Sequence, residues 1–262
     1  MKTNYDVIVV GGGINGVGVT LDLASRGFSV CLVEKKTLGS GASSNTSKLV
    51  HGGLRYLEYG HISLVKEALK EQEILLRIAP KYVKPLSVYL PCYKGLGRSA
   101  WMLKAGLSVY DLLFKRRLAK HQGFSRAKAQ GIFQDIGLRS EGLQKGFQFE
   151  DAIMDDLGLL MGIVKTAKIF NADVLELTQV ESIQGVDNHY DVTITQDAGH
   201  RKSLSSRCVV HTAGAWFSEL SRAALLSCRG PLSGARRTAR RRYPQRRPSR
   251  APSSGGRARA RC

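Results

Sequence analysis

Cysteine is scarce in this chain, and its arrangement excludes two kinds of stabilising site. The five cysteines, Cys31, Cys92, Cys208, Cys228 and Cys262, are odd in number, and none belongs to a C-x-x-C pair. Disulfide frameworks of small proteins use even sets, and structural zinc sites use closely spaced pairs. We therefore expect no disulfide framework, no bound metal and a reducing compartment.

Long apolar runs are missing as well. No stretch reaches the roughly 18 uncharged residues of a membrane-spanning helix, and no signal-peptide pattern precedes the apolar run at residues 5–10. The sequence therefore predicts a cytoplasmic protein.

Acidic residues and lysine are absent from one end of the chain. The whole sequence carries 40 Lys and Arg against 21 Asp and Glu, a net charge of +19, which is typical of nucleic-acid binding. However, residues 227–262 hold 12 arginines and no acid, so the rest of the chain has 28 basic residues and a net charge of only +7. This low-complexity segment is predicted to be a disordered tail. We interpret it as non-native sequence, such as an out-of-frame translation; an arginine-rich arm for nucleic acid is the alternative.

The N-terminal residues carry a dinucleotide-binding pattern. A β-branched run at residues 5–10 leads into Gly11, Gly13 and Gly16, which match G-x-G-x-x-G and precede a helical sequence. The first glycine permits a tight turn, the second lets the backbone approach a pyrophosphate, and the third lets helix and strand pack closely. The N-terminus of the helix, near Ile14 and Asn15, then offers N–H groups to the phosphates.

An acid follows at the distance that this pattern requires. Glu34 ends a second apolar run, residues 30–33, and lies 18 residues after Gly16. A carboxylate at this place accepts hydrogen bonds from a ribose and disfavours a 2′-phosphate, so NADP is not expected. FAD and NAD both satisfy the pattern. The hydroxyl-rich residues 38–48 favour FAD, because such a loop can pass close to a cofactor and donate to it; a flexible surface loop is the alternative.

A longer string narrows the cofactor and the chemistry. Residues 11–18, 22–27 and 32–35, and above all 47–58 (SKLVHGGLRYLE), resemble the FAD-dependent glycerol-3-phosphate dehydrogenases, a branch of the amino-acid-oxidase-like flavoproteins. The similarity extends to about residue 220. It implies an α/β fold with a Rossmann-like FAD-binding domain of the GR2 type and an incomplete substrate domain, because the family is about twice as long.

The resemblance also implies a domain organisation and a reaction. Residues 1–226 would form the oxidoreductase domain, with FAD bound by 1–80 and 145–220 and a partial substrate or cap part at 81–144; residues 227–262 would form the tail. The family oxidises sn-glycerol 3-phosphate to dihydroxyacetone phosphate, with hydride transfer to flavin N5 and electrons passed to quinone, or to oxygen in oxidase relatives. Its members commonly lie on the inner membrane face. We expect this shortened chain to bind FAD weakly and to turn over slowly.

By resemblance, one set of residues contacts the cofactor and another faces the substrate. The cofactor set is Gly11, Gly13, Ile14, Asn15, Gly16, Glu34, Lys35, Ser43, Ser44, Thr46, Ser47, Lys48, Leu49, Val180, Ala213, Gly214 and Trp216. The substrate set is His51, Arg55 and Tyr56. Their chemistry agrees: an arginine fork suits phosphate, histidine accepts a proton near neutral pH, and a phenol hydrogen-bonds a hydroxyl. The general base stays open.

Two other function classes stay open at this point. One is a related flavoprotein that oxidises an amino or hydroxy acid, with Arg55 holding the carboxylate. The other is a non-catalytic protein that binds nucleic acid through the arginine tail, which we consider unlikely because the charge is confined to that segment.

The rest of the chain predicts a few further elements. Apolar spacing indicates helices over 61–79, 101–120 and 157–165. The helix at 101–120 ends in a basic run at 115–117, which favours a core helix over a membrane-surface helix. Residues 190–195 and 180–183 are predicted to pair as a hairpin, and 208–211 to form a buried strand.

Overall fold

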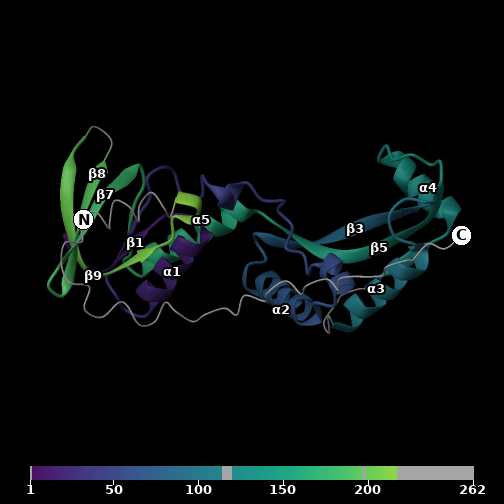
Figure 1. Ribbon diagram of the computed structural model, residues 1–262, viewed down its shortest axis with the longest axis horizontal. Helices are drawn as coiled ribbons and strands as arrows, with labels where there is room; N and C mark the ends of the chain where they lie inside the picture. Colours follow the sequence, from purple (N-terminus) through teal and green to yellow (C-terminus); the bar gives the residue numbers. More distant parts are fainter. Residues whose placement is uncertain (1, 114–119, 197–198, 217–262) are drawn as a thin grey trace, which may run out of the picture. The chain divides into compact units, whose positions relative to one another are not determined.

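The alternation of buried apolar residues near the N-terminus builds the first sheet. The computed structural model describes residues 2–113, 120–196 and 199–216. In it, β1 (Asn4–Val10) lies between two parallel neighbours, β2 (Val30–Val33) and β9 (Arg201–His211). The six strands are ordered β6-β2-β1-β9-β8-β7, with β6 (Asp173–Leu175) parallel to β2 (Figure 1). The predicted doubly covered α/β fold is confirmed.

The two faces of this sheet are covered by different elements. Val7 and Val9 of β1 pack with α1 (Ile14–Ser25) and α5 (Asp156–Ile169) in one core. Ile8 and Val10 point to the other face, where β7 (Thr178–Val186) and β8 (His189–Gln196) supply the core residues Val180 and Val192. Burial on both faces explains why β1 and β2 are apolar throughout rather than alternating.

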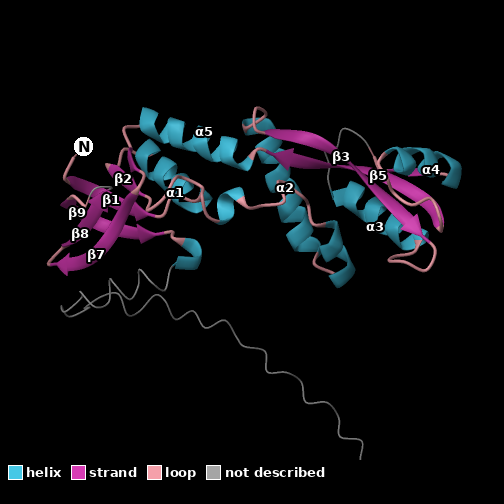
Figure 2. Ribbon diagram, turned by 90° about the horizontal axis from the view of Figure 1, so that it is seen from above, coloured by secondary structure: helices cyan, strands magenta, loops and turns pink. Residues whose placement is uncertain are grey.

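A second, antiparallel sheet is built from the middle of the chain. Its order is β3-β5-β4, with β3 (Val83–Tyr93), β4 (Gln122–Phe124) and β5 (Leu143–Met154). The helices α2 (Ile62–Ile78) and α3 (Ala100–Leu113) pack on one side of it around Leu69, Leu107 and Tyr110 (Figure 2). The fourth helix, α4 (Arg126–Asp135), forms a separate small core with Leu143.

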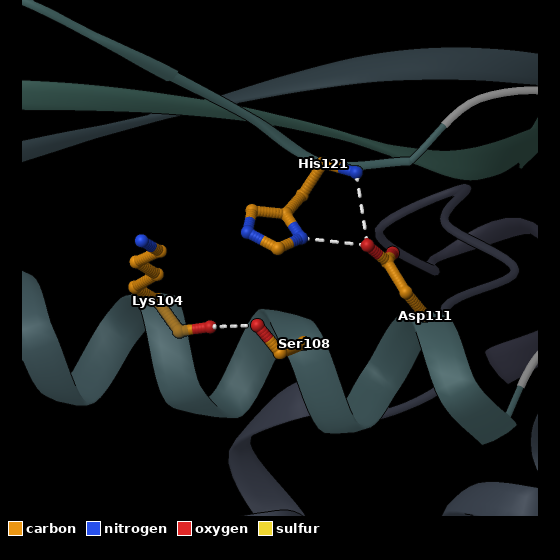
Figure 3. Close-up of polar contacts among 4 residues, drawn as sticks. All are labelled: Lys104, Ser108, Asp111 and His121. Carbon is orange, nitrogen blue, oxygen red and sulfur yellow. Dashed lines mark hydrogen bonds and ion pairs between the residues drawn. The ribbon is translucent and has the colours of Figure 1, made fainter.

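A polar pair fastens the chain to α3 where it re-enters the second sheet. The Asp111 carboxylate lies 2.6 Å from Nδ1 of His121 and accepts the His121 backbone N–H at 3.0 Å, beside the Ser108 hydroxyl that donates to the Lys104 carbonyl (Figure 3). Both side chains of the pair are largely buried. Asp111 therefore fixes the start of the segment that leads into β4.

Most of the predicted elements are present, and two long strands were missed. The predicted hairpin is the β7–β8 pair, and the helix expected at 61–79 is α2. The helix expected at 101–120 is described only as far as Leu113; its basic residues at 115–117 and the tail at 227–262 lie outside the described residues. The sequence analysis did not predict β3 as a strand, because Pro85 and Pro91 interrupt it.

Candidate functional site

The carboxyl ends of three parallel strands bring the glycine pattern and Glu34 to one edge of the first sheet. Val10 of β1 pairs with Val33 of β2 on one side and with His211 of β9 on the other. The loops that follow these residues therefore begin side by side. In open α/β sheets, ligands bind outside this edge, so the three loops define the candidate site.

The geometry of the glycines matches the roles that the pattern assigns to them. Gly11 has φ +111°, and a Cβ there would lie 2.8 Å from the backbone of Thr212 and Ala213. A Cβ at Gly16 would lie 1.8 Å from the Gly11 carbonyl oxygen, so the helix packs against the turn only because Gly16 has no side chain. At Gly13, the Ser43 Oγ at 3.2 Å is the one described atom within 4 Å. The space beside Gly13 is therefore open for a ligand at the start of α1.

Glu34 joins two of the loops. Its Oε2 accepts the Gly12 N–H at 2.6 Å, and its Oε1 accepts the Lys36 N–H at 2.8 Å. Each carboxylate oxygen keeps further acceptor capacity, so this geometry leaves room for the predicted ribose contact. Lys35, between them, is exposed.

The hydroxyl-rich loop is tied to both helices of the first sheet. Ser43 Oγ, in the short 3₁₀ helix η1 (Ala42–Ser44), accepts the Ile14 N–H at 3.0 Å and so lies at the start of α1. Further along, the Thr46 hydroxyl donates to Asp156 at 2.8 Å and accepts the Lys48 N–H at 2.9 Å. These contacts argue against the flexible surface loop considered from the sequence.

Asp156 is a residue that the sequence analysis missed. It lies in the first turn of α5, where the preceding Asp155 caps the helix by accepting the Gly158 N–H at 2.9 Å. The hydrogen bond from Thr46 lowers the pKa of the Asp156 carboxyl, with a smaller contribution from the charge of Lys48. The pair of acids before an apolar helix signalled a helix start, but its contact with residue 46 is visible only in the fold.

The loop after β9 forms the far side of the site. The Thr212 hydroxyl donates to the carbonyl oxygens of Val10 and Gly11, at 3.0 and 2.9 Å. Burial lowers the pKa of His211, and its Nδ1 accepts the Ala213 N–H at 3.3 Å, as a neutral imidazole can. Gly214 has φ +56° and begins η3 (Gly214–Trp216). The Trp216 ring lies beside Gly41, where a Cβ would be 3.2 Å from it.

The remaining cofactor candidates lie in different surroundings. The Ser44 hydroxyl makes a long 3.4 Å hydrogen bond to the Gly41 carbonyl, and Ser47 is exposed. Asn15 is exposed on the first turn of α1. The Val180 side chain is buried in the core, so a contact there would be made by its backbone.

The three substrate candidates follow directly from the cofactor loop. The Val50 N–H donates to the Ala152 carbonyl, and the Met154 N–H to the Lys48 carbonyl, each at 2.8 Å, while Leu49 bridges Ile153 across the end of β5. The next residue, His51, is exposed. Arg55 and Tyr56, on the 3₁₀ helix η2 (Leu54–Tyr59), are exposed too.

Two further searches gave negative findings for the described part of the chain. Within residues 2–113, 120–196 and 199–216, no helix has the length and apolar character needed to cross a membrane. Over the same ranges, no cluster of three His, Cys, Asp or Glu side chains is placed to hold a metal ion.

The fold and this site define the class of protein. A nucleotide-binding sheet with open space at Gly13, and a loop that runs on to a His-Arg-Tyr set, is the arrangement of a flavin-linked oxidoreductase. The chain matches the FAD dependent oxidoreductase family, DAO, over residues 6–255. The protein therefore belongs to this family of FAD-dependent oxidoreductases.

Particular relatives are enzymes of polyol phosphates. The chain is 39% identical over 218 residues to the glycerol-3-phosphate dehydrogenase of Pseudomonas tolaasii, covering 83% of this chain and 41% of that protein. It is 39% identical over 223 residues to the D-erythritol 1-phosphate dehydrogenase of Brucella abortus (strain 2308), covering 82% and 42%. The chain thus spans about two fifths of the length of these relatives.

Solved structures agree with the fold. The glycerol-3-phosphate dehydrogenase from Bacillus halodurans, complexed with FAD, superposes with a TM-score of 0.63 at 25% identity, covering 85% of this chain and 36% of that one. The L-alpha-glycerophosphate oxidase from Mycoplasma pneumoniae with FAD bound has a TM-score of 0.62 at 18% identity, covering 86% and 58%. The second likeness shows the fold alone.

Proposed function

We propose that this chain is the FAD-binding part of a dehydrogenase that oxidises sn-glycerol 3-phosphate to dihydroxyacetone phosphate. The observation that carries the proposal is the path of residues 43–56. This segment contacts the start of α1 through Ser43, pairs with the end of β5 through Val50, and then presents His51. One continuous stretch of chain thereby connects the cofactor edge with the substrate residues.

The residues at the sheet edge fit FAD. The pyrophosphate would lie beside Gly13 at the N-terminus of α1, where the backbone N–H groups and the positive end of the helix dipole stabilise anions. Glu34 would accept hydrogen bonds from the ribose. The remaining cofactor residues, by resemblance, are Gly11, Ile14, Asn15, Gly16, Lys35, Ser43, Ser44, Thr46, Ser47, Lys48, Leu49, Val180, Ala213, Gly214 and Trp216. When bound, FAD would supply the hydride acceptor.

The substrate residues have separate tasks in this proposal. Arg55 would bind the phosphate of the substrate through its planar set of N–H donors. His51 would take the proton of the C2 hydroxyl as the hydride leaves. Tyr56 would hydrogen-bond a second hydroxyl and hold the sugar carbon chain in place.

The electron acceptor and the location are part of the same proposal. Quinone would reoxidise the enzyme, and the protein would be cytoplasmic with peripheral attachment to the inner membrane face. An aerobic glycerol-3-phosphate dehydrogenase of Escherichia coli (strain K12), 37% identical over 215 residues, supports the aerobic assignment. Since this chain spans 42% of that relative, we expect weak FAD binding and slow turnover from the chain by itself.

A second substrate deserves direct comparison. The similarity to D-erythritol 1-phosphate dehydrogenase equals that to the glycerol 3-phosphate enzymes. Both substrates combine a phosphate with a secondary hydroxyl, so Arg55 and His51 would act on either in the same way. The length of the polyol would then be selected by residues that contact the far end of the substrate.

The proposal is tested by anaerobic titration of the FAD-loaded protein with glycerol 3-phosphate, D-erythritol 1-phosphate, L-proline and glycine, following flavin absorbance near 450 nm. Bleaching by glycerol 3-phosphate alone supports the proposal. Bleaching by the tetritol phosphate alone moves the substrate to a longer polyol. Bleaching by an amino acid, and by neither phosphate, refutes it.

A further inference from the structure

A buried carboxylate lies behind the exposed loop that carries His51. Asp151 of β5 is 8% exposed, and Gln72 of α2, which donates to it, is 2% exposed. Neither residue belongs to the set proposed for FAD or for substrate contact. A buried carboxylate on a central strand is expensive unless it is paired, so its retention calls for a function.

Gln72 connects this carboxylate to the backbone on one side of His51. The Gln72 Nε2 donates to the Val50 carbonyl oxygen and to Asp151 Oδ1. Both partners are acceptors, so the amide atom facing them is the nitrogen, and both of its N–H groups are used. Val50 is held again by its N–H, which donates to the Ala152 carbonyl at 2.8 Å.

The backbone on the other side of His51 is held by α3. The Gly52 N–H donates to the Tyr110 hydroxyl at 3.0 Å, and the Tyr110 ring is fully buried in an edge-to-face contact with Phe149. A Cβ at Gly52 would lie 2.2 Å from Leu69. The loop is therefore pressed into the core at residues 50 and 52, while His51 between them projects outward.

Charge links the carboxylate to the histidine. Burial raises the pKa of Asp151, and the Gln72 hydrogen bond, the Ala152 N–H and the positive charge of His51 lower it in turn. The other charged side chains around the adjoining cavity are Glu73 and Arg77 of α2, Lys84 of β3 and Glu150 of β5. By reciprocity, an ionised Asp151 favours the protonated imidazole of His51.

We propose that Asp151 is a positioning residue for His51: with Gln72 it fixes the loop and places a negative charge behind the imidazole while that ring takes up the substrate proton. This role rests on the proposed function of the same site. The carboxylate touches no substrate, and its action passes through the Val50 carbonyl and the field at His51.

The first test measures the coupling without any catalysis. The Asp151 carboxyl is titrated by carbon-13 NMR in the full 262-residue protein, in His51→Gln and in the control His61→Gln. His51 and His61 are both exposed, so both variants are expected to fold. We expect the Asp151 midpoint to rise in His51→Gln and to stay unchanged in His61→Gln. An unchanged midpoint in His51→Gln overturns the proposal.

The second test separates positioning from a purely structural role. In FAD-loaded protein, Asp151→Asn is expected to lower the limiting rate of flavin reduction by glycerol 3-phosphate about tenfold or more, with the Kd for that substrate within about twofold. The control Glu150→Gln, which alters the neighbouring residue of β5, is expected to change neither. Equal rates in Asp151→Asn and wild type refute the role. A wild type that glycerol 3-phosphate fails to reduce refutes the proposed function instead, and the carboxyl titration then decides on Asp151.

Discussion

Gly16 and Gly18 on α1 provide a matched pair of substitutions with opposite expected effects on stability. A Cβ at Gly16 would lie 1.8 Å from the Gly11 carbonyl oxygen and 2.7 Å from the Thr212 Oγ1. The first of these is backbone, so it cannot move aside as a flexible side chain does. At Gly18, no described heavy atom lies within 4 Å of the same added carbon.

The two changes therefore differ in sign. Gly16→Ala forces α1 away from the end of β1, and overpacking of this kind costs about 1–3 kcal/mol or more. Gly18→Ala gains helix propensity at an unobstructed position, worth roughly 0.5–1 kcal/mol. The free energies of unfolding of the two variants should thus differ by about 2–4 kcal/mol.

Urea denaturation followed by circular dichroism measures this difference. The midpoint is expected to fall for Gly16→Ala and to rise slightly for Gly18→Ala, with the slope unchanged. FAD affinity should fall in Gly16→Ala, because the turn at Gly11 moves with the helix, and should be retained in Gly18→Ala. A Gly16→Ala protein as stable as wild type would contradict the close packing described here.

Three further outcomes follow from the charges of the site. Because burial raises the pKa of Asp151 above its unfolded value, the wild type should lose stability relative to Asp151→Asn as pH rises from 4 to 8, as measured by urea midpoints at each pH. The Thr46 hydrogen bond lowers the pKa of Asp156, so Thr46→Val should cost about 1 kcal/mol at pH 6, and this cost should vanish as pH falls through the lowered pKa; a cost that persists in acid would show a packing effect instead. Arg55→Lys should raise the Kd for glycerol 3-phosphate about tenfold in a flavin titration, since a lysine has no planar fork; an unchanged Kd would place the phosphate elsewhere.

The nucleotide-binding half of the fold was readable because its signals are local. The run at residues 5–10, the glycines and Glu34 lie within 34 residues of each other, and each has one physical reason to be there. The β7–β8 hairpin was readable for the same reason, since its two strands are adjacent in sequence.

The second sheet and the support of His51 were not readable because they depend on distant pairs. β3 and β5 pair across some 60 residues, as Val83 with Met154 shows. Gln72 and Asp151 meet over 79 residues, and Thr46 and Asp156 over 110. Nothing in the spacing of a glutamine on a helix indicates that both of its N–H groups are used in the core.

The most direct test of the central claim is the affinity for FAD of the wild-type chain and of Gly13→Ala. The claim is that the space beside Gly13 is kept open for the cofactor pyrophosphate. A Cβ there meets Ser43 Oγ at 3.2 Å and no other described atom within 4 Å, so the variant should fold with nearly unchanged stability. We predict measurable FAD binding by the wild type and at least about tenfold weaker binding by Gly13→Ala. Equal affinity in the two proteins, or no binding by the wild type, would contradict the account.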